Sequence, residues 1–176
     1  MSGGASRKME ILFEILLMNF EKYDMDALKK DVATCKQLVD EGADWDKKNK
    51  LKVFEGVYCM LIRDFKRAAE LFISSIATFT CIELLTYKQF IFYTVVMSLL
   101  TQDRKTIKKE IIHSPDVLSV IRDIPNLKQF CDSYYQCEYK QHFQSFVEIL
   151  DTLKTDKYLS SHLQYYSKEM RLVAYR

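Results

Sequence analysis

The segment from Gly42 to Phe72, GADWDKKNKLKVFEGVYCMLIRDFKRAAELF, predicts two amphipathic helices joined by a short turn. Small residues stand where two helix backbones would have to approach closely, among them Gly56 and Ala68. Together with Phe72 and Ser75 they have a spacing that is typical of a tetratricopeptide-type helical hairpin. Such a hairpin cannot bury its apolar face alone, so it stacks on neighbours and builds an extended surface. The segment therefore favours a scaffold over an enzyme with a pocket.

The composition of the whole chain extends this prediction to the rest of the fold. The chain has 176 residues, which is within the usual size range of one domain. It contains only four glycines and two prolines, whereas strand-rich folds need turn residues about every 8–12 positions. We therefore expect an all-α fold, built as a right-handed stack of helical hairpins.

Apolar residues at helical spacing place the other helices. Asp64 is expected to cap a helix whose apolar stripe runs from Phe65 through Phe72 to Phe79. Thr86 with Gln89 has the pattern of a capping box. Pro125 is expected to begin a later helix. The other expected helices cover residues 8–20, 25–41, 45–62, 103–113 and 115–121.

Two features of the predicted core are specific. Phe72 and Tyr58 are expected to be core residues of one hairpin and to meet near Gly56. Two long helices are expected to close the chain as an antiparallel hairpin. Their predicted apolar stripes are Tyr139, Phe143, Phe146, Leu150 and Leu153, and then Leu159, Leu163, Tyr166, Met170 and Val173.

One apolar run, FIFYTVVMSLL at residues 90–100, is a membrane candidate by composition. Its eleven residues are too few, because a spanning helix needs about 20. We expect a buried core helix there.

At the start of the chain, MSGGASR (residues 1–7) is interpreted as a cloning scar or a disordered lead-in. The first helix has apolar residues on both faces, including Ile11, Ile15 and Met18. We therefore expect a further helix to pack against its second face.

The charge balance gives no support to nucleic-acid binding. The chain has 26 basic and 24 acidic side chains, a net charge of +2, whereas such binders gain most of their affinity by neutralising phosphates. The run RKTIKK contains Lys105, Lys108 and Lys109, and we expect these side chains on the solvent side. If they contact a partner, an acidic segment fits best. The aromatic residues near the C-terminus are interpreted as packing residues rather than a stacking platform for bases.

No catalytic or metal-binding arrangement is apparent from the sequence, and we expect no cofactor. The three histidines fall on different predicted helices and are expected at the surface or its boundary. Cys137 and His142 are five residues apart, which is not the spacing that puts two ligands on one helical face. The five cysteines are expected to be reduced and mostly buried, Cys137 included, because their number is odd. A cysteine enzyme remains an alternative that a thiol titration would test.

Beyond these patterns, several segments of the amino-acid sequence resemble a known family. The segments are DWDKKNKLKVFEGVYCMLIRDFKRAAELF, ATFTCIELLTYKQFIFYTV, IPNLKQFCDSYYQCEY, HFQSF and YYSKEMRLVAYR. They run in order through residues 25–176 and resemble the PCI-family subunits of the 26S proteasome lid. A subunit of the COP9 signalosome with the same architecture is the nearest alternative, and an RNA-binding PCI protein of the mRNA-export type is another.

The resemblance implies a non-catalytic scaffold of the cytoplasm and nucleus that acts in ubiquitin-dependent degradation. It implies that residues 8–113 are helical repeats and that 114–176 are the helical part of a PCI module, without the winged helix of family members. The implied partners are neighbouring PCI subunits of the lid and a small acidic disordered subunit, with no nucleic acid and no membrane. That acidic subunit would contact the lysines of RKTIKK, whereas Tyr165 and Leu172 would lie where a winged helix docks.

Overall fold

The structure is a computed structural model that describes residues 3–175, and every regular element in that range is helical. The all-α prediction is therefore confirmed for this part of the chain. The α-helices are α1 (Gly3–Lys22), α2 (Met25–Asp40), α3 (Trp45–Leu61), α4 (Phe65–Ile73), α5 (Tyr87–Thr101), α6 (Arg104–Ile107), α7 (Pro115–Ile121), α8 (Leu127–Gln136), α9 (Tyr139–Lys154) and α10 (Leu163–Ala174). Short turns of other helix types are η1 (Ile76–Thr78), η2 (Lys108–Ile112) and η3 (Ser160–His162).

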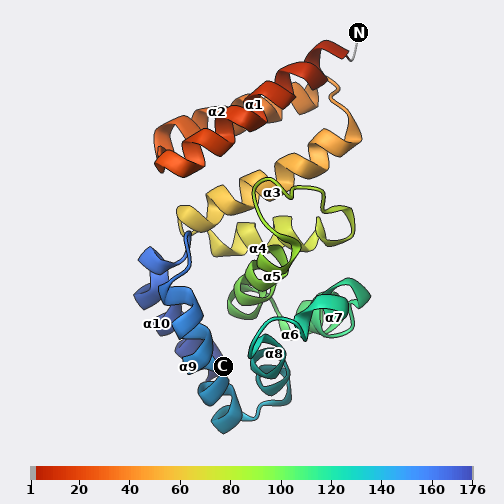
Figure 1. Cartoon of the computed structure of the whole chain (residues 1–176). Coiled ribbons are helices and arrows are strands. Elements are labelled where there is room, and N and C mark those ends of the chain that lie inside the picture. Colours follow the sequence, from red (N-terminus) through yellow and green to blue (C-terminus); the bar gives the residue numbers. More distant parts are fainter. Residues whose placement is uncertain (1–2, 176) are drawn as a thin grey trace.

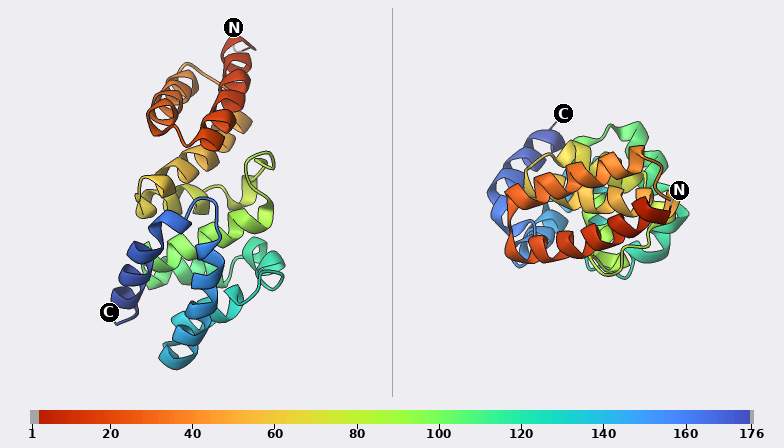
Figure 2. Two further views of the ribbon diagram at one scale, coloured as in Figure 1. Left: turned by 60° about the vertical axis from the view of Figure 1, so that its left-hand side comes forward. Right: turned by 90° about the horizontal axis from the view of Figure 1, so that it is seen from above.

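The helices form an elongated stack (Figures 1 and 2). The α1/α2 hairpin covers one end, and α3 packs on α2 and on α4 beneath it. Helix α5 follows in the centre, with α6, α7 and α8 beyond it. The last two helices, α9 and α10, run back along one side of the stack, where α10 contacts α5. The right-handed sense of the stack stays a prediction.

Capping side chains explain where several helices begin. The Asp64 side chain accepts a hydrogen bond from the Arg67 amide at 3.2 Å, as predicted for the start of α4. At the start of α5, the Gln89 amide donates to Thr86 Oγ1 and the Thr86 amide donates to Gln89 Oε1, at 3.2 and 3.0 Å. These bonds satisfy amides that have no partner within the helix. The capping box read from the sequence is confirmed.

The α3/α4 hairpin is held together by a close approach at Gly56. A Cβ atom added there would stand 2.4 Å from Cε1 of Phe72, which is fully buried. The Phe72 ring also meets Phe90 of α5 edge-on, with ring centroids 5.6 Å apart. The absence of a side chain at Gly56 therefore lets α4 bring Phe72 directly against the backbone of α3. Tyr58 is only partly buried and packs against the margin of this core, so the prediction that it is a core residue is wrong.

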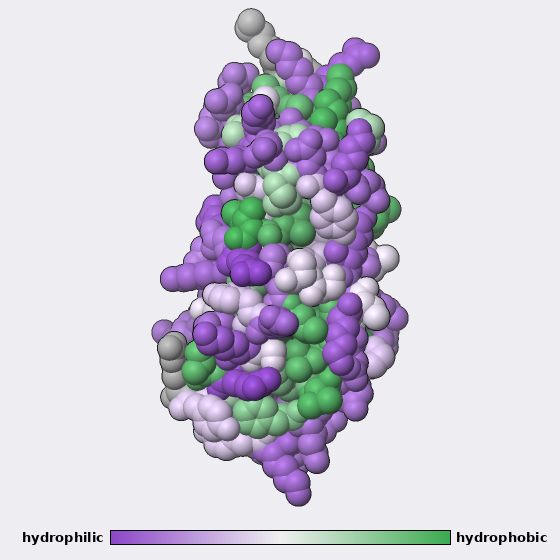
Figure 3. All heavy atoms as spheres, turned by 90° about the vertical axis from the view of Figure 1, so that its left-hand side faces the viewer, coloured by the Kyte–Doolittle hydropathy of each residue, from purple (hydrophilic) through white to green (hydrophobic). Residues whose placement is uncertain are grey.

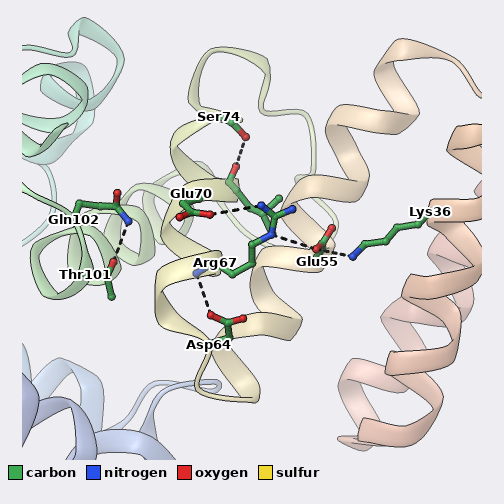
Figure 4. Close-up of polar contacts among 9 residues, drawn as sticks. Lys36, Glu55, Asp64, Arg67, Glu70, Ser74, Thr101 and Gln102 are labelled. Carbon is green, nitrogen blue, oxygen red and sulfur yellow. Dashed lines mark hydrogen bonds and ion pairs between the residues drawn. The ribbon is translucent and has the colours of Figure 1, made fainter.

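An ion-pair network ties α2, α3 and α4 together across their faces (Figure 4). Glu55 of α3 is only 8% exposed, and its carboxylate lies 2.8 Å from Lys36 Nζ of α2. On the other side, Arg67 Nε of α4 is 3.7 Å from the same carboxylate oxygen, and Arg67 also pairs with Glu70. A nearly buried carboxylate needs such partners to offset its lost hydration. The network thus joins two consecutive hairpins, α1/α2 and α3/α4, as well as the two helices of one hairpin.

Helix α5 is the centre of the molecule. All ten residues from Phe90 to Leu99 are buried, which explains the apolar run and confirms the predicted core helix. Two tyrosines fix the C-terminal part of the chain against it. Tyr93 Oη donates to the Asp156 carboxylate at 2.7 Å, and Tyr166 Oη of α10 donates to the Val96 carbonyl at 2.9 Å.

The end of α1 also contacts the segment that joins α9 to α10. Tyr23 Oη donates to the Lys157 carbonyl at 2.7 Å, and Lys157 Nζ pairs with Glu21 at 2.5 Å. The rings of Phe20 and Tyr158 meet edge-on at 6.2 Å. Residues more than 130 positions apart in the sequence therefore lie together, in addition to the contacts between neighbouring helices.

Three boundary or face predictions need correction. Helix α1 begins at Gly3, so residues 3–7 are helical rather than a disordered lead-in; Met1 and Ser2 lie outside the described residues. Helix α8 begins at Leu127 rather than at Pro125, because Asn126 has a left-handed backbone with φ 62° that separates the two. The stripe from Phe65 ends early as well, since α4 stops at Ile73.

The buried face of α9 is rotated by about one residue from the predicted stripe. The ring of His142 stacks on Phe130 of α8 with centroids 4.9 Å apart, and the imidazole therefore packs as a core side chain. Tyr139 is exposed as a consequence. The buried residues of α9 are His142, Ser145, Phe146, Ile149 and Leu153.

Candidate interaction surfaces

The three lysines predicted as a partner surface are all exposed, and we call them the basic strip (Lys105, Lys108 and Lys109). They lie on α6 and the π-helical turn η2, whose opposite side buries Ile107 and Ile111. The π turn is closed by a hydrogen bond from the His113 amide to the Lys108 carbonyl at 3.0 Å. The predicted solvent-side placement of the strip is confirmed.

Electrostatics leave most of the basic strip available to a partner. Lys109 Nζ lies 2.7 Å from a Glu110 carboxylate oxygen, and this hydrogen bond raises the pKa of Lys109. Among the described residues, neither Lys105 nor Lys108 has a carboxylate within ion-pair distance. Two of the three charges are therefore free to attract an acidic segment.

Tyr165 and Leu172, both predicted as an interdomain surface, are partly exposed but line different hollows. Tyr165 packs on Phe65 of α4, with ring centroids 5.7 Å apart, and lies under the Arg63 guanidinium at 5.4 Å. Its hollow faces the start of α4. Leu172 instead lines a groove between α9 and α10. The structure therefore does not bring the two side chains into one site.

The hollow lined by Leu172 has a volume of about 490 Å³, and we call it the α9/α10 groove. Leu150, Leu163 and Leu172 supply its apolar surface, with Leu172 47% exposed. Figure 3 shows apolar atoms gathered on the lower part of this face, with hydrophilic side chains on both sides. The remaining lining residues are Lys154, Gln164, Ser167, Lys168 and Arg171. The sequence analysis did not identify the three cations among them, Lys154, Lys168 and Arg171. Lys168 and Arg171 are three residues apart, which is a helical spacing that could have indicated a shared face.

A second hollow, of about 700 Å³, lies where α8 meets α6 and α10. Cys137 lines it and is exposed, so the prediction of a buried thiol is wrong at this position. Cys137 ends α8 with a left-handed backbone, φ 60°, which turns the chain out of the helix. Arg104 Nη2 donates to its Sγ at 3.1 Å and to the Tyr135 carbonyl.

The other four cysteines are buried, as predicted. Burial raises the pKa of the Cys35 thiol to about 11 and the pKa values of Cys59, Cys81 and Cys131 to about 12. These thiols therefore stay protonated near neutral pH and are poor nucleophiles.

Two of the histidines are buried, contrary to the prediction of surface or boundary positions. His142 is 1% exposed and His162 is 8% exposed, whereas His113 is at the surface. Burial lowers the pKa of both buried imidazoles. His162 Nδ1 accepts a hydrogen bond from Arg63 Nε at 2.9 Å, and the nearby guanidinium lowers its pKa further. Both side chains serve packing between helices.

Within residues 3–175 there is no cluster of three or more His, Cys, Asp or Glu side chains arranged to hold a metal ion. None of the described helices combines the length and apolar character needed to cross a membrane. The features that stand out in the described chain are thus surface patches on a helical stack.

Stacked helical hairpins with exposed charged and apolar patches define the class of helical-repeat scaffold proteins. Comparison with protein families gives a more specific result. The family model described as "26S proteasome subunit RPN7" matches residues 2–110, which is more than half of the sequence. The chain belongs to this family.

Relatives from plants and yeast agree with the family. The chain is 44% identical over 169 residues to the 26S proteasome non-ATPase regulatory subunit 6 of Oryza sativa subsp. japonica. It is 43% identical to the homolog of that subunit in Arabidopsis thaliana and 31% identical to the regulatory subunit RPN7 of Saccharomyces cerevisiae. Each alignment covers 96% of this chain but only 40–44% of the relative. The chain thus spans less than half the length of these relatives.

Proposed function

We propose that this chain is a non-catalytic structural part of the lid of the 26S proteasome regulatory particle, where it supports ubiquitin-dependent degradation through protein contacts. The observation that carries the proposal is the family membership, with relatives named as proteasome regulatory subunits. The architecture supports the same conclusion, because stacked repeats present long surfaces on which other subunits can pack. Its partners would be neighbouring PCI subunits, and its location the cytoplasm and nucleus.

Within this proposal, the basic strip contacts the small acidic subunit of the lid. The support is electrostatic: Lys105 and Lys108 are exposed and have no carboxylate partner in the described part of the chain. An acidic disordered segment gains from several such charges at once, and its binding weakens as salt screens them. We also propose that residues 8–113 are repeats and that 114–176 belong to the PCI module.

The relatives favour the proteasome lid over the COP9 signalosome, because those described above are named as proteasome subunits. The near-balanced charge, 26 basic against 24 acidic side chains, gives no support to an RNA-binding function. A cysteine enzyme is disfavoured because the one exposed thiol in the described chain, Cys137, contacts Arg104 and has no histidine hydrogen-bonded to it.

Co-expression with recombinant subunits tests the proposal. The tagged chain should co-elute with proteasome lid subunits in size-exclusion chromatography and should not recover signalosome subunits or single-stranded RNA. The variant Lys105→Glu/Lys108→Glu/Lys109→Glu should keep its helical circular dichroism and lose the small acidic subunit. A matched control, Lys29→Glu/Lys30→Glu/Lys66→Glu, reverses three exposed lysines on α2 and α4 and should retain the small acidic subunit. Recovery of signalosome subunits, or of neither complex, would contradict the proposal.

A further inference from the structure

The α9/α10 groove has a long apolar surface with cations on its rim. Its apolar residues are Leu150 from α9 and Leu163 and Leu172 from α10, and the leucines of α10 are nine residues apart. Since a helix rises 1.5 Å per residue, the groove extends for roughly 13 Å along α10. That length matches about nine residues of a helix laid beside it, which is enough for two or three apolar anchors.

All charged side chains that line the groove are positive. Lys154 stands on the α9 side, and Lys168 and Arg171 stand on the α10 side. Lys154 is partly neutralised by Asp151 at 2.5 Å, but Lys168 has no ion pair in the described chain. Arg171 Nη2 donates to Ser167 Oγ at 3.1 Å, a neutral acceptor that leaves its charge uncompensated. The rim therefore selects an occupant with carboxylates on its flanks.

We propose that the α9/α10 groove binds a short amphipathic helix of a partner protein, with two or three leucine-like anchors on one face and acidic residues beside them. Anchors at i, i+4 and i+7 fall on one helical face and can contact the leucines from both sides of the groove, while glutamates on the flanks meet Lys154 and Arg171. This surface is separate from the basic strip and extends the scaffold function proposed above to a second contact.

The same chemistry weighs against a symmetric pairing of two copies. If two α9/α10 grooves faced each other, Lys168 and Arg171 of one copy would oppose the like charges of the other. Like charges opposed at an interface carry a cost, whereas an acidic helix removes it. A partner helix therefore satisfies both the leucines and the cations, and a facing copy satisfies only the leucines.

Binding of designed peptides to the whole chain tests the inference. The probe is a helical peptide of about 12 residues with leucines at i, i+4 and i+7 and glutamates on both flanks. Two matched peptides carry lysines in place of the glutamates or serines in place of the leucines. With leucine methyl labelling, the acidic peptide should shift the signals of Leu150, Leu163 and Leu172, and neither matched peptide should do so.

Charge reversal at the rim gives the decisive comparison. Lys168→Glu/Arg171→Glu should weaken binding of the acidic peptide by about tenfold or more, since two attractions become repulsions. Lys105→Glu/Lys108→Glu makes the same change of net charge at the basic strip and should leave the affinity within about twofold. All four positions are exposed, so both variants are expected to fold.

Several outcomes would overturn the inference. They are no methyl shift at about 1 mM peptide, equal binding of the lysine-flanked peptide, or equal weakening by the two double variants. Sedimentation showing a dimer that Leu172→Glu dissociates would assign the groove to a second copy instead. The peptide assay contains no lid subunits, so it is independent of the co-elution experiment. If the chain co-elutes with lid subunits but does not bind the acidic peptide, the groove inference alone is refuted. If the chain binds the peptide but does not co-elute with lid subunits, lid membership alone is refuted.

Discussion

Replacing Gly56 by alanine tests the close approach that organises the α3/α4 hairpin. The added Cβ would stand 2.4 Å from Cε1 and 2.8 Å from Cδ1 of Phe72, whereas ordinary contacts begin near 3.4 Å. The Phe72 ring would thus have to move by about 1 Å, since 3.4 − 2.4 = 1.0. Phe72 is fully buried and its ring is edge-on to Phe90, so little free space is available for that movement.

Two opposing effects set the magnitude. Alanine stabilises a helix interior by about 1 kcal/mol relative to glycine. Overpacking a well-packed core costs about 1–3 kcal/mol, and a contact with two ring atoms at once belongs in the upper part of that range. We therefore expect Gly56→Ala to lower the free energy of unfolding by about 1–2 kcal/mol. For a chain of this size, that corresponds to a fall in Tm of roughly 2–8 °C.

A double-mutant cycle in urea makes the prediction specific to Phe72. Phe72→Ala alone should cost about 3–5 kcal/mol through lost transfer energy and a cavity. In that background the clash is gone, so Gly56→Ala should now stabilise by up to about 1 kcal/mol. The sign of the glycine substitution should therefore invert between the two backgrounds.

Gly4→Ala in α1 is the matched control, because a Cβ there meets nothing within 4 Å. It should leave stability unchanged or raise it slightly. The reasoning fails if Gly56→Ala is neutral or stabilising with Phe72 present, or if its effect is the same in both backgrounds.

Three further predictions concern protonation, thiols and surface charge. Burial lowers the folded-state pKa values of His142 and His162, so the unfolded chain, with histidine pKa values near 6.5, binds protons first as the pH falls. Stability should therefore be full above about pH 6.5 and decrease below it; equal urea midpoints at about pH 7.5 and 5.5 would contradict this. In thiol titration of the native chain, Cys137 should react first and the four buried cysteines only upon unfolding, and Cys137→Ala should remove the fast phase; two or more fast thiols would refute the assignment. Charge reversal of the basic strip should change the free energy of unfolding by less than about 0.5 kcal/mol per site, and a loss of cooperative unfolding would contradict its surface placement.

Local signals made much of the fold predictable from the sequence. The hairpin around Gly56 combines helical periodicity with a cap at Asp64, and both act within a few residues. The run from Phe90 to Leu99 is apolar on every side, which fits only a helix surrounded by neighbours. The exposure of the basic strip followed for the same reason, because charges are costly to bury without partners.

The errors arose where a distant neighbour decides the outcome. His142 is a core residue because Phe130 of another helix offers its ring face, and no local pattern in α9 indicates this. Cys137 is exposed because the chain leaves α8 with a left-handed backbone at that residue. The α9/α10 groove likewise depends on the relative position of two helices. Leu172 was predicted as a surface residue, but the cations beside it could not be assigned to one site before α9 and α10 were paired.

The contacts between the end of α1 and the segment at Lys157 bear on how the protein folds during synthesis. A simple repeat array gains stability one unit at a time, so its first hairpins can complete while later ones are still being translated. Here the hydrogen bond of Tyr23 cannot form until Lys157 has been synthesised. Likewise, α5 cannot complete its contacts until Tyr166 of α10 is present. Nascent chains should therefore expose part of the α5 surface until α10 emerges from the ribosome, and helices α1 to α10 should then unfold as one unit rather than one hairpin at a time.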